Sequence, residues 1–157
     1  MITATPVAPL VTHPFYRADV DDIEAIKQLK ARYFRMMDTK DWDGMREVFA
    51  DDVLIDTTDS GGRVVAGADE FMAGLREILE DVLTVHHGHM PEIELTSATT
   101  ATGVWSMEDM LRWPNGSELH GFGHYREEYE KSDGRWRIKK MTLTRLRTDF
   151  NPATPDA

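Results

Sequence analysis

The sequence predicts one α+β domain in which helices come first and a curved antiparallel sheet follows. Up to about residue 82 the apolar residues recur at helical spacing, and from Thr84 onward they alternate with polar residues as in strands. The 157 residues are 41% hydrophobic and 29% charged, which suits a single hydrophobic core. We expect a cone-shaped domain over residues 19–149, an N-terminal arm over 1–18 and a tail over 150–157.

Composition narrows the classes of function. A formal net charge of -10 disfavours nucleic-acid and anionic-membrane partners, because the surface repels phosphate groups. The absence of cysteine excludes disulfides, thiolate metal sites and cysteine nucleophiles. The sequence has no apolar run long enough to span a bilayer and no basic start typical of a secretory signal, so we expect a cytoplasmic protein.

Three helices are expected, and in a cone they would cover the concave face of the sheet. The first begins at an Asp19 N-cap and ends near Asp38, with its apolar positions at Ile23, Ile26, Leu29, Tyr33 and Met37. The second is capped by Asp41 and carries Trp42, Met45 and Phe49. The third follows Gly67 and carries Phe71, Leu75, Ile78 and Val82.

The strands are delimited by turn residues. Residues 53–55 and 63–65 flank Asp-Ser-Gly-Gly at 59–62, which predicts a small hairpin. Pro-Asn-Gly at 114–116 and Ser-Asp-Gly at 132–134 predict two further turns.

The last strand contains an irregularity. Its apolar positions move from even numbers, at Trp136 and Ile138, to odd numbers, at Met141 and Leu143. A regular strand would then expose half of its core side chains, so we predict a β-bulge at 139–141.

Acid/base chemistry is indicated by the run His86-His87-Gly88-His89 together with Asp109, because both segments are predicted strands. An imidazole can accept a proton from carbon, and a carboxylate on its other nitrogen fixes the tautomer. We assign these roles to His86 and Asp109. Tyr33 could donate a hydrogen bond to a developing enolate oxygen. This chemistry needs no metal and no organic cofactor.

Each candidate has a structural alternative. For His86 and Asp109 it is a purely structural pair, or one side chain that faces outward, because a register shift of one residue reverses either face. Tyr33 lies on the apolar stripe of its helix and could be a core residue. Asp38 is five positions later, about 140° away on an ideal helix, so it joins Tyr33 at a site only if the helix end loosens, and it could instead be a capping or solvated residue. His87 and His89 share the face opposite His86, and this pair would suit a metal ion. The sequence offers no third ligand at a fixed spacing for such a site. Glu127 is a rival acid or base to Asp109.

The expected cavity is apolar. We assign its lining and substrate contacts to Trp105, Met107, Phe122, Tyr125 and Glu127. Nine methionines suit an adaptable pocket for a flat apolar ligand, such as a steroid-like or aromatic ring system.

Three segments carry a family resemblance: Tyr33-Phe34-Arg35, Asp41-Trp42-Asp43 and the closing Gly134 to Ile138. Together with the order of elements, they resemble the SnoaL-like branch of the nuclear transport factor 2-like superfamily, over roughly residues 19–149. This resemblance implies a cone that hosts dehydratases, isomerases, cyclases, hydrolases and binding modules.

Within the superfamily the pattern is closest to the bile-acid 7-alpha-dehydratases, with scytalone dehydratases more distant. The residues that match are Tyr33, Asp38, His86 and Asp109. The resemblance also implies a basic residue near the end of the last strand, for which we favour Arg145 over Arg147.

The leading hypothesis is therefore a cofactor-independent dehydratase or isomerase, acting on a small hydrophobic carbonyl compound. The alternatives are a non-catalytic small-molecule-binding module and a polyketide-type aldol cyclase. A polar cluster at the cavity floor would favour an enzyme, whereas a wholly apolar pocket would favour binding alone. The outer face of such a sheet commonly pairs with a second copy, so we expect a homodimer or trimer.

Overall fold

The elements follow the predicted order. The structure, a computed structural model, describes residues 14–153. Its helices are α1 (Pro14–Asp38), α2 (Trp42–Arg46) and α3 (Ala68–Leu79), with a short 3₁₀ turn, η1 (Thr58–Ser60). Its strands are β1 (Phe49–Asp56), β2 (Val64–Ala66), β3 (Leu83–Gly88), β4 (Glu92–Leu95), β5 (Thr100–Arg112), β6 (Glu118–Ser132) and β7 (Arg135–Asn151).

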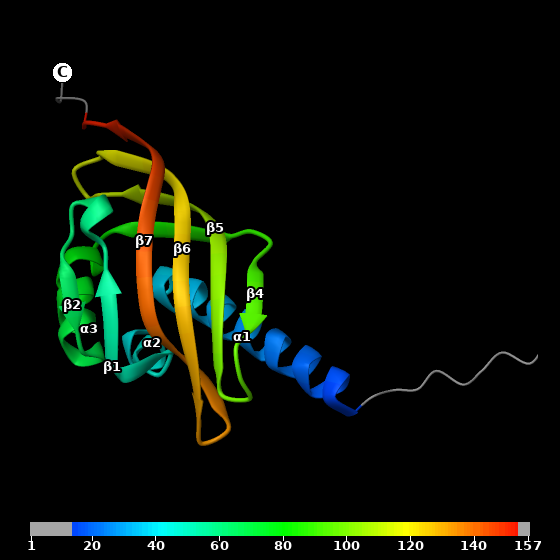
Figure 1. The fold of residues 1–157 in the computed structure, drawn as a ribbon. Coiled ribbons are helices and arrows are strands. Elements are labelled where there is room, and N and C mark those ends of the chain that lie inside the picture. Colours follow the sequence, from blue (N-terminus) through cyan, green and yellow to red (C-terminus); the bar gives the residue numbers. More distant parts are fainter. Residues whose placement is uncertain (1–13, 154–157) are drawn as a thin grey trace, which may run out of the picture.

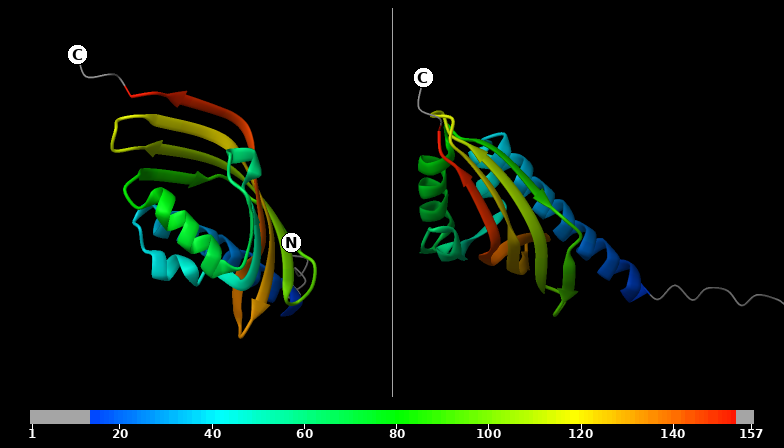
Figure 2. Two further views of the ribbon diagram at one scale, coloured as in Figure 1. Left: turned by 90° about the vertical axis from the view of Figure 1, so that its left-hand side faces the viewer. Right: turned by 90° about the horizontal axis from the view of Figure 1, so that it is seen from above.

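The seven strands form one curved sheet in the order β2-β1-β7-β6-β5-β3, and β4 also pairs with β5 (Figure 1). The three helices lie on its concave side (Figure 2). The predicted fold class is confirmed, with one difference in the sheet. The β1–β7 pair is parallel. The two strands are neighbours in the sheet but far apart in the sequence, so no hairpin joins them and they need not be antiparallel.

The hydrophobic core fills the space between the helices and the concave face. Ile26 and Leu29 of α1 are buried there, as are Trp105 of β5 and Ile138 of β7. Among the described residues, no helix is both long and apolar enough to cross a membrane.

Three expected helix boundaries need correction. Val82 lies beyond α3, which ends at Leu79. Helix α1 begins at Pro14, so Asp19 lies inside the helix and is not its N-cap; proline is well suited to the first helical position. Phe49 does not belong to the second helix but opens β1, where its buried ring packs edge-on against Phe71. The Asp41 cap is confirmed, since its carboxylate accepts a hydrogen bond from the Gly44 amide at 3.0 Å.

The predicted hairpin is present, because β1 and β2 pair antiparallel across residues 57–63. The turns at 114–116 and 132–134 join β5 to β6 and β6 to β7. Of the expected arm and tail, residues 1–13 and 154–157 lie outside the described part of the chain.

Strand β7 contains two bulges. Tyr129 pairs with Ile138 and Glu128 with Lys140, which leaves Lys139 as an extra residue and confirms the predicted irregularity. Further along, Gly123 pairs with Arg145 and Phe122 with Arg147, so that Leu146 is extra. This second bulge lies directly beside Arg145, a residue of the cavity described below.

Candidate active site

A cavity of about 410 Å³ lies between the helices and the concave face of the sheet. Most of its wall is apolar, from residues that include Met37, Phe71, Leu75, Leu111 and Leu143. Its polar and titratable side chains include Tyr33, His86, Asp109, Tyr125 and Arg145, and Thr57, Ser60, Arg63 and Glu70 also line it. An apolar cavity with a few convergent polar groups is the usual form of a small-molecule site.

His86, on β3, is held by Asp38 at the end of α1. The Asp38 carboxylate receives the His86 backbone N–H at 2.8 Å and lies 2.6 Å from Nδ1 of the ring. An ionised carboxylate at Nδ1 favours the tautomer that carries its proton there, which leaves Nε2 as the acceptor. The ring is buried, and it stacks on Phe34 with an angle of 18° between the planes.

Asp38 is fixed in turn by Thr84, whose hydroxyl donates to it at 2.9 Å and receives Lys40 Nζ at 3.0 Å. Burial raises the pKa of Asp38, but the hydrogen bonds from His86 and Thr84 outweigh it, so the pKa lies below its ordinary value. Asp38 is therefore an ionised partner for His86 at neutral pH.

Asp109, on β5, forms a bidentate ion pair with Arg145 of β7, in which Nη1 donates to Oδ1 at 2.8 Å and Nη2 donates to Oδ2 at 2.7 Å. Burial lowers the pKa of Arg145, but the Asp109 carboxylate more than offsets this and the pKa is raised. Arg145 also donates from Nε to Ser60 at 2.7 Å and from its backbone to Asp59 at 2.5 Å. The turn between β1 and β2 thus holds the guanidinium in place.

Tyr33 of α1 and Tyr125 of β6 meet edge to face, with ring centroids 5.7 Å apart. Both rings are buried. Burial raises the pKa of Tyr33 and of Tyr125 above the ordinary value for a phenol. Each hydroxyl is therefore protonated at neutral pH.

The expected pairing of His86 with Asp109 is wrong. The two residues lie directly opposite each other in the β3–β5 register, but the imidazole binds Asp38 and the carboxylate binds Arg145. The reason is that the end of α1 contacts β3, so the carboxylate of Asp38 lies closer to Nδ1 than that of the neighbouring strand. Asp38, given above as a candidate with a capping alternative, contacts the imidazole directly.

Several predicted lining residues lie elsewhere. Trp105 and Met107 are buried in the core beside the cavity and not on its wall. Trp105 donates to Tyr129 at 2.8 Å, and Met107 contacts Arg145. Phe122 lies on the outer face with His120, because its even position opposes that of Tyr125. Glu127 is buried behind the cavity and pairs with Lys30. Of the predicted contacts, Tyr125 and Arg145 do line the cavity.

The other histidines lie away from the cavity. His87 and His89 are exposed and approach Glu108 at 3.9 Å, and His120 contacts the same carboxylate at 2.6 Å. Within residues 14–153, no group of three or more His, Asp or Glu side chains is arranged to hold a metal ion. Arg147 is also exposed and pairs with Asp149, whereas Arg145 faces inward.

Three functional neighbours were not anticipated from the sequence: Thr84, Ser60 and Lys30. Lys30 had a readable signal, because it lies four residues after Ile26 and four before Phe34 on the apolar side of α1. The role of Ser60 depends on the path of the turn, which no sequence pattern specifies.

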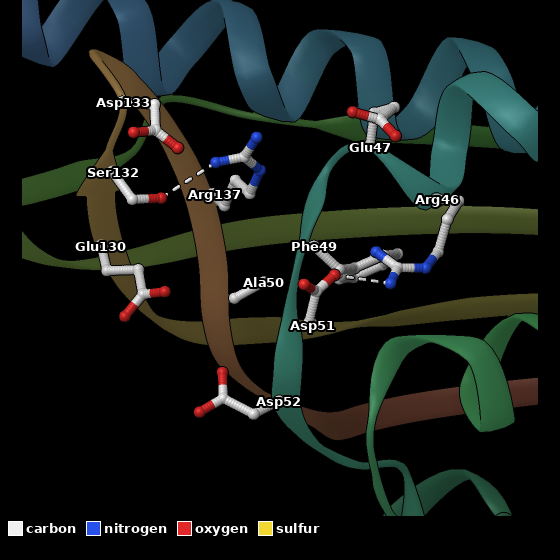
Figure 3. A pocket seen from close by; sticks show the side chains of 10 residues that line it. All are labelled: Arg46, Glu47, Phe49, Ala50, Asp51, Asp52, Glu130, Ser132, Asp133 and Arg137. Carbon is white, nitrogen blue, oxygen red and sulfur yellow. Dashed lines mark hydrogen bonds and ion pairs between the residues drawn. The ribbon is translucent and has the colours of Figure 1, made fainter.

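A second hollow lies on the surface between α2, β1 and the β6–β7 turn (Figure 3). Its side chains are mainly charged, and Arg46 and Arg137 point toward Asp51 and Ser132 (Figure 3). None of the predicted site residues lines it.

The comparisons with known proteins agree with this architecture. Residues 18–142 match the SnoaL-like domain family. The chain therefore belongs to this family, within the nuclear transport factor 2-like superfamily.

Several solved structures share the fold. A provisionally assigned scytalone dehydratase from Novosphingobium aromaticivorans is 20% identical, with a TM-score of 0.79 over 85% of this chain and 90% of its own. A hexachlorocyclohexane dehydrochlorinase, LinA type 2, is 18% identical, with a TM-score of 0.79 over 90% and 97%. The protein Rv3472 from Mycobacterium tuberculosis, of unknown function, is 24% identical, with a TM-score of 0.75 over 87% and 78%.

Proposed function

We propose that this protein is a cofactor-independent lyase or isomerase that removes a proton from carbon next to a carbonyl group. The observation that carries the proposal is the convergence of polar side chains on one apolar cavity. His86 is paired with an ionised carboxylate, and two protonated phenols and a neutralised ion pair line the same space. A site that only carried an apolar ligand would not need this arrangement.

In the proposed reaction, Nε2 of His86 takes the proton while Asp38 stabilises the resulting imidazolium. General base catalysis of this kind contributes about 10²- to 10⁴-fold. Tyr33 and Tyr125 donate to the carbonyl oxygen as it gains enolate charge, and each such donor is worth on the order of 3 kcal/mol of barrier.

Dehydration follows if the substrate carries a hydroxyl on the β-carbon. The C–O bond breaks as the enolate collapses to an unsaturated carbonyl, and the imidazolium returns its proton to the departing hydroxyl, which leaves as water. If no such group is present, the proton returns to another carbon and the product is an isomer. The Asp109–Arg145 pair supplies donors for a further polar group of the substrate.

For the substrate we propose a flat, apolar carbonyl compound of the steroid or polycyclic aromatic type. The apolar wall supports this class. The class also agrees with the resemblance of Tyr33, Asp38, His86 and Asp109 to the residue pattern of the bile-acid 7-alpha-dehydratases. Two of the fold relatives are named as a dehydratase and a dehydrochlorinase, and both names denote elimination reactions. These names agree with the proposed proton abstraction and elimination.

The test uses 5-nitrobenzisoxazole, which opens to a coloured nitrophenolate when a base removes its C–H proton. It is followed by turnover screens of 3-oxo steroids, bile-acid intermediates and aromatic β-hydroxy ketones. We expect His86→Ala and Asp38→Asn to lose at least 10²-fold in kcat on any compound turned over. His87→Ala, an exposed neighbour on the other face, is the matched control and should keep full activity. Equal activity of the wild type and His86→Ala would refute the proposed base.

We also propose that the protein self-associates through the outer face of the sheet, which no helix within residues 14–153 covers (Figure 2). Light scattering at several protein concentrations measures the mass directly. A monomer at every concentration would refute this.

A further inference from the structure

Lys30, on α1, has a fully buried side chain, and so has its partner Glu127 on β6. Their Nζ and Oε1 atoms are 2.5 Å apart. An ion pair placed inside a core loses the hydration of both charges, and such a pair is not needed for stability, because well-packed apolar residues often serve equally well. The proposed proton abstraction does not use either residue.

The position of the ammonium group relates it to the cavity. Nζ of Lys30 lies 3.7 Å from the ring centroid of Tyr125 and 3.9 Å from that of Tyr33. It lies 4.9 Å from the centroid of Phe34, which stacks on His86. The cation therefore contacts the faces of both phenols that line the cavity.

The counter-ion is held by a chain of hydrogen bonds. Glu127 accepts the hydroxyl of Tyr129, and Tyr129 in turn accepts the indole N–H of Trp105. Burial lowers the pKa of Lys30, and the Glu127 carboxylate offsets part of this effect. The Glu127 carboxylate, held in this way 2.5 Å from Nζ, favours the ammonium form of Lys30 against the two rings.

We propose that Lys30 is a positioning residue that makes Tyr33 and Tyr125 a binding site for an oxyanion. A cation against the face of an aromatic ring is attracted by its π electrons and draws electron density away from the hydroxyl. The hydroxyl becomes a stronger donor, and negative charge on a bound oxygen is stabilised. The ligand class is an aryl or enolate oxyanion, and for its catalytic consequence the inference rests on the proposed function.

The experiment compares two ligands of matched shape, 4-nitrophenolate and nitrobenzene, at a pH where the first is ionised. Dissociation constants are measured for the wild type and for Lys30→Met/Glu127→Gln, which removes both charges but keeps an acceptor for Tyr129. We expect about tenfold weaker binding of 4-nitrophenolate and less than twofold change for nitrobenzene. If this variant does not fold, Lys30→Gln/Glu127→Gln takes its place.

A second arm tests whether the effect passes through the phenols. In a Tyr33→Phe/Tyr125→Phe background, the same removal of Lys30 and Glu127 should change 4-nitrophenolate binding less than twofold. Lys131→Met is the matched control, because Lys131 also ties β6 to α1 through Asp22 and lies 5.7 Å from a tryptophan ring, away from the cavity. It should leave both ligands unchanged.

Three results would overturn the inference: equal losses for the two ligands, no loss for 4-nitrophenolate, or no binding of 4-nitrophenolate by the wild type. A loss that persists without the phenols would overturn it as well. These measurements require no turnover. If the protein turns over none of the screened substrates but the charge-removal variant still loses 4-nitrophenolate binding selectively, the result counts against His86 as the base. It does not count against the role of Lys30.

Discussion

Gly121 lies on β6 between the two members of the Asp109–Arg145 pair, which come from the strands on either side. A Cβ atom added to it would lie 2.2 Å from Oδ1 of Asp109 and 2.3 Å from Nη1 of Arg145. Both distances are far below van der Waals contact, so the carboxylate and the guanidinium must move. The close packing of this ion pair therefore requires glycine at position 121.

The cost of Gly121→Ala follows from this geometry. Overpacking of a core costs typically about 1–3 kcal/mol, and partial loss of a buried bidentate pair adds to it. We expect about 3 kcal/mol in total, which lowers the Tm of a domain of this size by roughly 6–12 °C. Scanning calorimetry of the wild type and the variant measures the change.

The same substitution in an Asp109→Ala/Arg145→Ala background provides the control. Without the two long side chains the new methyl group has room, so the added cost should fall below about 1 kcal/mol. A Gly121→Ala protein with the Tm of the wild type, or an equal cost in both backgrounds, would refute the steric reasoning.

Further predictions concern Asp38 and Asp41. Asp38→Asn should destabilise the fold by about 2 kcal/mol in urea unfolding at pH 7, because the carboxylate receives charge-assisted hydrogen bonds from His86 and Thr84. The folded-state pKa of Asp38 is lowered, so its contribution is present above the unfolded pKa of about 3.9 and is lost as the pH falls through the folded value. The two unfolding free energies should thus converge in strong acid, and a constant difference down to pH 2 would contradict this assignment. Asp41→Ala removes the cap of α2 and should cost about 1 kcal/mol, whereas Asp43→Ala, two residues later, should cost less.

The sequence was sufficient where one local rule decides the outcome. The change from even to odd apolar positions located the bulge at Lys139, and the Asp41 cap followed from its place before Trp42. The same parity rule excludes Phe122 from the face of Tyr125, so that error was avoidable.

The partner of His86 could not be obtained in this way. Sequence spacing places Asp109 opposite His86 across two strands, and the register agrees. The choice between Asp38 and Asp109 depends on how α1 crosses the sheet and on the competing guanidinium of Arg145, both of which are tertiary effects. A helix terminus is weakly specified by periodicity, and Asp38 is at such a terminus.

The final strand has a consequence for assembly of the protein. In the sheet, β7 lies between β1 and β6, so within the described residues the β1–β2 ladder joins the other strands only through β7. During synthesis on the ribosome, β7, which carries Arg145, leaves the exit tunnel after strands β1 to β6. A nascent chain stalled before residue 135 therefore has two disconnected sheet fragments and no complete cavity. Insertion of β7 between the edge strands β1 and β6, which are synthesised earlier, completes both the sheet and the site.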